Sequence, residues 1–187
     1  MPEPLVLPVL RGPRVTLRPT ELADATALFA IFSDAAVMRY WSTAPWTDPA
    51  RGAELVESDR AALASGEAMR WAIADAADVV VGCVSLHRFH AQCRRAELGY
   101  LLGRRAWGRG YATEALRLAL DHAFGPLGLH RIEADTDPRN TRSTALLERV
   151  GFTREGVLRE RWIVDSEVSD TAYYGLLARE WAAVRDR

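Results

Sequence analysis

The stretch Arg105-Ala106-Trp107-Gly108-Arg109-Gly110-Tyr111-Ala112 lies between a predicted strand, 95–102, and a predicted helix, 111–124. Its two glycines let the backbone turn tightly and present bare N–H groups to a ligand. The helix that follows adds its own unpaired N–H groups and the positive end of its dipole. Together with the guanidinium groups of the stretch, these donors suit a pyrophosphate. A glycine-rich turn with solvated arginines is the alternative interpretation.

Two other phosphate-binding motifs do not fit this stretch. Gly108 and Gly110 are followed by Thr113, where the dinucleotide-binding fingerprint has its third glycine. Hairpin-like strands precede the stretch, whereas that fingerprint belongs to a βαβ unit. All 24 basic residues are arginine, which excludes both a P-loop lysine and a Schiff-base lysine.

The rest of the chain predicts a mixed α/β domain with a largely antiparallel sheet. Strands are expected over 14–18, 69–74, 79–89, 95–102, 131–136, 153–163 and 168–177. Helices are expected over 20–32, 48–65, 111–124 and 142–150, with a last turn near 181. No repeat or linker divides the chain, so we expect an extended segment over 1–10 and a single domain over 11–187.

Composition narrows the class of protein. The chain has 187 residues, 49% of them hydrophobic, which is typical of one globular domain with a substantial core. A net charge of -1 argues against a nucleic-acid binder, which usually carries a basic surplus. The sequence contains no run of about 18 apolar residues, which is the length that a membrane-spanning helix needs.

Targeting and metal signals are weak. Met1-Pro2-Glu3-Pro4 does not look like a signal peptide, so we expect a cytoplasmic protein. Cys83 and Cys93 are ten residues apart and form neither a disulfide framework nor a zinc site alone. His87 and His90 have a poor spacing for a shared metal, so no metal is predicted.

Several segments together resemble the GNAT superfamily of N-acetyltransferases. Arg105-x-x-Gly108-x-Gly110 matches its pyrophosphate signature, [RQ]-x-x-G-x-[GA]. Similar segments follow the family's order along residues 11–182: Leu17-Arg18-Pro19, Gly82-x-x-x-Leu86, Ala96-Glu97-Leu98-Gly99-Tyr100, Asn140-Thr141-Arg142-Ser143 and Leu146-x-Glu148-x-x-Gly151-Phe152. Glu155-Gly156, Asp170 and Tyr174-Gly175-Leu176-Leu177 resemble the branch that contains ribosomal-protein N-terminal acetyltransferases.

The resemblance implies the GNAT fold, a mixed and mostly antiparallel sheet with a splayed central strand and flanking helices. It also implies acetyl-CoA as co-substrate and a primary amine as acceptor. Backbone groups of Tyr100, Leu101 and Leu102 would pair with pantetheine, and an N–H there would polarise the thioester carbonyl. Amides of Arg105, Ala106, Trp107, Gly108, Arg109, Gly110, Tyr111 and Ala112 would hold the pyrophosphate. Asn140 and Ser143 would contact the CoA arm, or serve only as helix caps.

Direct transfer needs an uncharged amine. A peptide α-amine has a pKa of about 7.7–8.0 against about 10.4 for lysine, so an N-terminal acceptor demands less of a base. The candidate catalytic bases are Glu97, the first choice, and Asp135; Glu133 shares the face of Asp135. Where many GNAT enzymes have a tyrosine acid, this chain has Leu147, so no acid is assigned.

Tyr40, Trp41 and Trp46 lie where the family builds its acceptor wall, although they fit equally well as a plug at the end of the core. The leading function is transfer of acetyl from acetyl-CoA to a protein or peptide N-terminal amine. A small-molecule amine, such as an antibiotic or polyamine, and a non-catalytic acyl-CoA sensor are the alternatives. A homodimer is also considered, because six tryptophans leave room for a self-associating surface.

Overall fold

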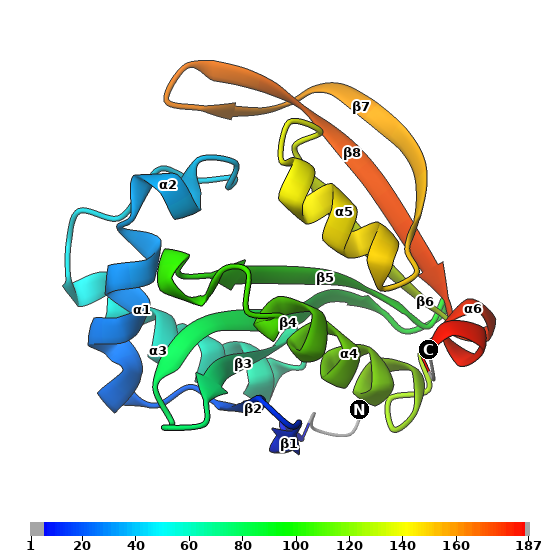
Figure 1. The fold of residues 1–187 in the computed structure, drawn as a ribbon, viewed down its shortest axis with the longest axis horizontal. Coiled ribbons are helices and arrows are strands. Elements are labelled where there is room, and N and C mark those ends of the chain that lie inside the picture. The colour runs from blue at the N-terminus through cyan, green and yellow to red at the C-terminus, as the bar shows by residue number, and fades with distance from the viewer. Residues whose placement is uncertain (1–5, 186–187) are drawn as a thin grey trace.

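One twisted sheet runs through the molecule (Figure 1). The computed structural model describes residues 6–185. Its eight strands have the order β1-β2-β3-β4-β5-β6-β8-β7, and only β5 and β6 run parallel. The strands are β1 (Leu10–Arg11), β2 (Val15–Pro19), β3 (Ala68–Asp75), β4 (Val80–His90), β5 (Arg95–Leu102), β6 (Arg131–Thr136), β7 (Thr153–Val164) and β8 (Glu167–Leu177).

Helices cover both faces of the sheet. They are α1 (Ala25–Phe32), α2 (Ala35–Met38), α3 (Ala50–Ser65), α4 (Tyr111–Phe124), α5 (Thr141–Arg149) and α6 (Ala178–Val184), with short 3₁₀ turns η1 (Leu22–Asp24) and η2 (Arg104–Ala106). Apolar residues of α4, α5 and α6 join one core cluster, and those of α1, α2 and α3 join another. The two sides are called the α4/α5 face and the α1/α3 face below.

Strand alternation explains the two cores. Along β3, Met69, Trp71 and Ile73 belong to the α4/α5 cluster, while Ala72 between them belongs to the α1/α3 cluster. Both faces of the central strands are therefore buried, as expected for a sheet covered by helices on both sides.

Most predicted elements are confirmed. The helix 111–124 and the strands 95–102 and 131–136 have the predicted bounds. Helix α3 begins where the Asp48 carboxylate accepts a hydrogen bond from the Ala50 N–H (2.9 Å), and it ends at Gly66, whose φ is 76°. The helix expected from 20 starts instead with η1, and α2 was not predicted because only four residues form it.

The N-terminal prediction is only partly visible. Residues 1–5 lie outside the described part of the chain, and within the expected extended segment the strand β1 begins at Leu10. The single domain over 11–187 stays a prediction. No helix within residues 6–185 has the length and apolar character needed to cross a membrane.

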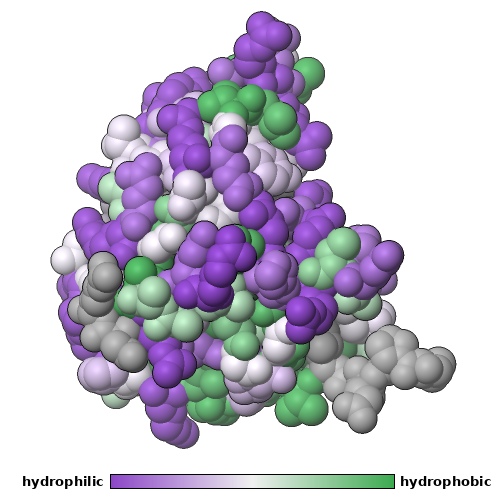
Figure 2. Space-filling view, turned by 90° about the vertical axis from the view of Figure 1, so that its right-hand side faces the viewer, coloured by the Kyte–Doolittle hydropathy of each residue, from purple (hydrophilic) through white to green (hydrophobic). Residues whose placement is uncertain are grey.

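The molecular surface is largely polar. The face in Figure 2 is mostly hydrophilic, with hydrophobic residues in small groups. Four of the exposed large hydrophobic residues lie on the β7–β8 hairpin: Val157, Leu158, Ile163 and Val168.

Substitution of Gly52 by alanine tests how closely α1 and α3 approach. A Cβ at Gly52 would lie 2.2 Å from the Ala25 carbonyl oxygen of η1–α1, so the two helices must separate. Glycine-to-alanine changes usually stabilise a helix by about 0.5–1 kcal/mol. Here we expect Gly52→Ala to lower the free energy of unfolding by about 1–3 kcal/mol, measured by denaturant titration. Ala61→Gly on exposed α3 surface controls for helix propensity, and a stabilised Gly52→Ala protein would contradict the predicted contact.

Candidate active site

The sheet opens between β5 and β6. Their pairing covers only Arg95–Glu97 against Arg131–Glu133, after which β5 stays with β4 and β6 stays with β8. The Gly103 N–H donates to the Val81 carbonyl of β4 (2.9 Å), and successive peptide groups of a strand alternate in direction. The backbone N–H and C=O groups of Tyr100 and Leu102 therefore point into the opening, beyond the last paired residues of β5 and β6. This is the splayed central strand expected from the sequence.

A cavity of about 2040 Å³ occupies the opening. It is lined from both faces: by β4 and β5, by the loop before α4, by the start of α5, by the loop after α2 and by the β7–β8 hairpin. Nearly all predicted CoA-binding residues line it, namely Tyr100, Leu101, Leu102, Ala106, Trp107, Gly108, Arg109, Gly110, Tyr111, Ala112, Asn140 and Ser143. Arg105 is the exception and is absent from the lining.

The glycine loop forms a concave surface beside α4. Gly108 and Gly110 both have left-handed backbone conformations, with φ of 73° and 77°. A Cβ at Gly108 would meet nothing within 4 Å, so this part of the backbone lies open to the cavity. Gly110 caps α4, and the first N–H of that helix bonded within the helix is that of Glu114. The N–H groups of the first turn are therefore available to an anion.

The arginines around this loop differ in their contacts. Arg104 is held by Asp34 at the start of α2 (2.7 Å), and it is not free for a phosphate. Arg109 lines the cavity as predicted, and α5 adds Arg142 and Arg149, which sequence reasoning missed. Arg142 lies over the Trp107 ring at 4.7 Å. The helical spacing of residues 142 and 149, two turns apart, was the signal that both share one side of α5.

Tyr100 connects β5 to α5. Its hydroxyl lies 2.5 Å from the Ser143 hydroxyl, and burial raises the pKa of Tyr100 to about 12. The Asn140 side chain accepts a hydrogen bond from the Ser143 N–H (3.2 Å), which is the cap geometry named as an alternative. Both residues nevertheless line the cavity.

Glu97 lies on the α1/α3 side of β5 and is 9% exposed. A bulge in β4 sets Arg88 and Phe89 against the single residue Ala96, and Arg88 has a φ of 52°. The bulge turns Arg88 toward Glu97, so that its Nη1 donates to both carboxylate oxygens (3.0 and 3.3 Å). The predicted base is therefore engaged in an ion pair.

His87 is a functional candidate that sequence reasoning set aside. It pairs with Glu97 across β4 and β5, with Nε2 3.8 Å from Glu97 Oε2, and it lines the cavity. Burial, opposed by the charge of Glu97, lowers the pKa of His87 below its usual value of about 6.5. The imidazole is therefore neutral near pH 7. His87 could have been identified from the register of β4 against β5, but the sequence alone does not determine that register.

Asp135 lies near the end of β6 and lines the same cavity. Its Oδ2 accepts hydrogen bonds from the Thr171 hydroxyl (3.2 Å) and the Trp162 indole (3.4 Å), so the β7–β8 hairpin holds it. Its charge acts on His87 as well. The structure thus brings Glu97, Asp135 and His87 to one cavity.

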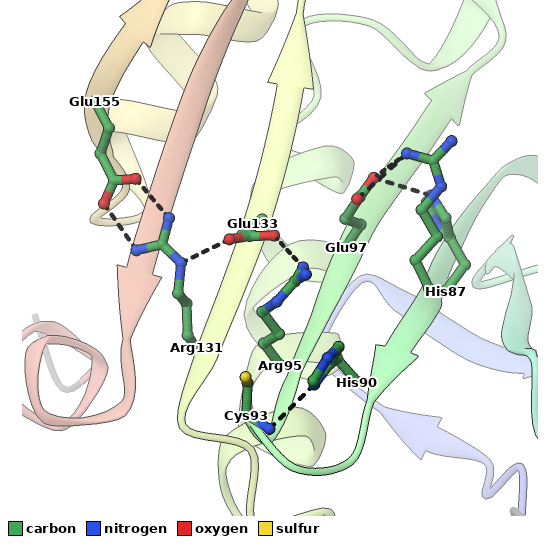
Figure 3. A network of polar contacts seen from close by, with 9 residues as sticks. His87, His90, Cys93, Arg95, Glu97, Arg131, Glu133 and Glu155 are labelled. Carbon is green, nitrogen blue, oxygen red and sulfur yellow. Dashed lines mark hydrogen bonds and ion pairs between the residues drawn. The ribbon is translucent and has the colours of Figure 1, made fainter.

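Glu133 belongs to a separate ion-pair ladder on the sheet (Figure 3). Arg95 donates to Glu133 (2.6 Å), and Arg131 bridges Glu133 (2.9 Å) and Glu155 (2.5 Å). Glu133 is absent from the cavity lining, although residues two apart on β6 share a face and Glu133 therefore lies on the same face as Asp135. Its environment is that of a residue holding β5, β6 and β7 together.

The three aromatic residues of the loop after α2 have different positions. Tyr40 and Trp41 line the main cavity. Trp46 is 8% exposed and stacks on Phe32 with ring centroids 4.4 Å apart, so it forms part of the α1/α3 core. It does not line the main cavity, but it does line a smaller pocket beside it.

The remaining sequence predictions concern an acid and a metal. Leu147, which occupies the position of the family tyrosine, is fully buried in the α4/α5 core. Within residues 6–185 no group of three or more His, Cys, Asp or Glu side chains is arranged to hold a metal ion.

Comparisons with known proteins assign the family. The model of the acetyltransferase (GNAT) domain matches residues 14–153. The uncharacterized N-acetyltransferase p20 of Bacillus licheniformis is 36% identical over 170 residues, covering 90% of this chain and 96% of that protein. Two solved structures are also similar.

Mycobacterium smegmatis RimJ, in complex with CoA-disulfide, is 30% identical, with a TM-score of 0.84, and the match covers 98% of this chain and 93% of that one. Spermidine N-acetyltransferase from Vibrio cholerae, in complex with CoA and spermine, is 25% identical, with a TM-score of 0.81 and coverage of 91% and 99%. The predicted GNAT fold is confirmed. The chain belongs to the GNAT acetyltransferase family and is an N-acetyltransferase that uses acetyl-CoA.

Proposed function

We propose that this enzyme acetylates the N-terminal amine of a protein or peptide. The observation that carries the proposal is that arginine side chains form ion pairs with most of the carboxylates in the cavity. Five acidic residues line it, and Arg88 engages Glu97 while Arg139 engages both Asp137 and Glu167. A polyamine would bring several ammonium groups at once, and few carboxylates are left to receive them.

Of the two structurally similar enzymes, the one from Vibrio cholerae is named for its acceptor, spermidine. RimJ is similar over 98% of the chain at 30% identity, and the spermidine enzyme over 91% at 25%. A polyamine therefore stays the second candidate, with Asp135 and Asp165 as the carboxylates in the cavity lining that no arginine engages. A homodimer and a cytoplasmic location stay predictions.

The donor half of the cavity is built for a thioester of CoA, which supplies the activated acetyl group. We assign the pyrophosphate to the N–H groups of the loop 106–110 and the first turn of α4, with Arg109 and Arg142 as nearby cations. The outward N–H group of Tyr100, beyond the last paired residues of β5 and β6, can donate to charge that develops on the acetyl oxygen. No side chain is needed for that role.

We assign proton removal from the amine to His87, directly or through one water molecule. A neutral imidazole can accept a proton near pH 7, whereas the Glu97 carboxylate is engaged by Arg88. Glu97 then stabilises the imidazolium that forms, since its Oε2 is 3.8 Å from His87 Nε2. Asp135 adds negative charge that favours the same proton transfer.

We assign stabilisation of the departing CoA thiolate to the hydroxyl groups of Tyr100 and Ser143. Tyr100 keeps its proton because its pKa is raised to about 12, and its hydroxyl is hydrogen-bonded to Ser143. This pair can therefore stabilise a thiolate by hydrogen bonding. A thiolate with a pKa near 8.5 needs little more at neutral pH.

The acceptor class is tested by measuring release of CoA thiol with a peptide panel and with spermidine, at equal amine concentrations. We expect kcat/KM for the best peptide to exceed that for spermidine by at least tenfold, because the paired carboxylates leave little attraction for remote ammonium groups. A preference for spermidine would replace the peptide proposal with the polyamine one.

The pyrophosphate assignment is tested with Gly108→Asp. A carboxylate there would occupy open cavity space and repel the phosphates, so we expect acetyl-CoA affinity to fall at least 100-fold by calorimetry. Gly66→Asp is the matched control, because Gly66 has a φ of 76°, no atom within 4 Å of its Cβ, and a position outside the cavity. Equal affinity in the two variants would remove the loop from the donor site.

The base assignment is tested by the pH dependence of kcat/KM for a peptide. Below the lowered pKa of His87 both the imidazole and the α-amine are protonated, so the logarithm of kcat/KM should rise with a slope of about 2 and then about 1 up to the amine pKa near 8. His87→Gln should leave a slope of about 1 throughout and reduce kcat/KM about 100-fold near pH 7.5. The exposed neighbour His90→Gln should change neither value. An unchanged profile in His87→Gln would exclude His87 as the base.

A further inference from the structure

A second, smaller pocket opens beside the catalytic groups on the α1/α3 face. It has a volume of about 190 Å³. The aromatic residues Phe32, Trp41, Trp46 and Tyr100 line it together with Leu55, and the small residue Cys83 lies among them. An engineered apolar cavity of about 150 Å³ is large enough to bind benzene. The pocket therefore has room for one apolar side chain of leucine or phenylalanine size.

The pocket is continuous with the main cavity. Six residues line both: Trp41, Thr43, Arg70, Ser85, Gly99 and Tyr100. Ser85 and Gly99 face each other across β4 and β5, as do His87 and Glu97. Because residues two apart on a strand share a face and lie about 7 Å from each other, the pocket mouth is one short step from the proposed base. A side chain on the same Cα as the reacting amine spans that step.

The charges around the pocket are of one sign. Among residues 6–185, its charged lining residues are Arg51 and Arg70, with no carboxylate in the lining. Arg70 has a partner behind it, since its Nε lies 3.4 Å from Asp59, while Arg51 stacks over Trp46 at 4.8 Å. Burial raises the pKa of the Cys83 thiol to about 11, so this residue stays neutral near pH 7. A lysine or arginine side chain, or the second ammonium of a diamine, would meet cations here.

We propose that this pocket binds the side chain of the acceptor's first residue and selects an uncharged apolar one. The inference rests on the proposed function, because it assumes that the acceptor is a peptide N-terminus. It adds a specificity determinant on α1, α3, β3, β4 and the loop after α2, and the pocket shares only Gly99 and Tyr100 with β5.

The test uses pentapeptides that are identical after the first residue, which is Leu, Phe, Ala or Lys. For the wild-type enzyme we expect kcat/KM with Leu or Phe to exceed that with Lys by at least about tenfold, within the range that an apolar pocket can supply. Cys83→Met fills the pocket from within. We expect it to reduce kcat/KM for the Leu peptide at least about tenfold and for the Ala peptide less than about threefold.

The matched control is Cys93→Met, the same substitution at an exposed cysteine in the β4–β5 turn, and it should change no ratio. Acetyl-CoA affinity, measured by calorimetry, should be equal in all three proteins. If Cys83→Met does not fold, Thr43→Trp replaces it, because Thr43 is exposed and lies at the pocket mouth. We expect Thr43→Trp to act on the Leu and Ala peptides as Cys83→Met does, with a large loss for the Leu peptide and a small one for the Ala peptide.

A binding measurement separates this inference from the proposed function. Toluene added to the wild-type protein should shift the indole N–H resonances of Trp41 and Trp46, and Cys83→Met should abolish the shift. Peptides acetylated without regard to their first residue would overturn the pocket inference and leave the proposed function standing. If no peptide is acetylated, the proposed function fails, and toluene binding alone decides whether the pocket takes an apolar group.

Discussion

The separation of β5 from β6 after Glu97 and Glu133 is the constraint on which the site depends. Buried peptide groups need hydrogen-bond partners, and two strands that part leave a row of them without any. One of these groups has a partner within the chain, because the Trp107 indole donates to the Leu102 carbonyl (2.8 Å). The outward groups of Tyr100 border the cavity and are available to a bound thioester. Ladder contacts from Arg131 and Arg95 to Glu133 hold the strands together up to the point where they part.

The opening joins two environments that the sheet otherwise keeps apart. On the α4/α5 side lie the glycine loop, the first turn of α4 and the arginines of α5, an arrangement that favours negative charge. On the α1/α3 side lie Glu97, His87 and the aromatic pocket, where charges are paired and apolar rings are exposed to the cavity. A donor with phosphates and an acceptor amine can therefore approach the same point of β5 from opposite faces. This division also lets acceptor specificity change without disturbing the CoA-binding loop.

On the acceptor side of the cavity, the partners of the charged residues matter more than the number of charged residues. Sequence reasoning ranked Glu97 ahead of Asp135 as the base. In the structure Arg88 holds Glu97, whereas the indole of Trp162 and the hydroxyl of Thr171 hold Asp135. Arg88 reaches Glu97 only because of the bulge in β4, which no composition or spacing rule located. His87 lies in the site because the register of β4 against β5 pairs it with Glu97.

Local patterns in the sequence determined most of the elements and predicted the proposed donor site. Gly108 and Gly110 between a strand and a helix, Asp48 and Gly66 at the ends of α3, and the alternation along β3 each act over a few residues, so they can be recognised along the chain. The tertiary structure alone decided that His87 meets Glu97 across two strands and that Trp46 stacks on Phe32 of α1. It also decided that Arg105 does not line the cavity. These contacts depend on register, on one bulge and on how α1 and α3 pack. Such relations join residues distant in sequence, and a single sequence carries no direct record of them.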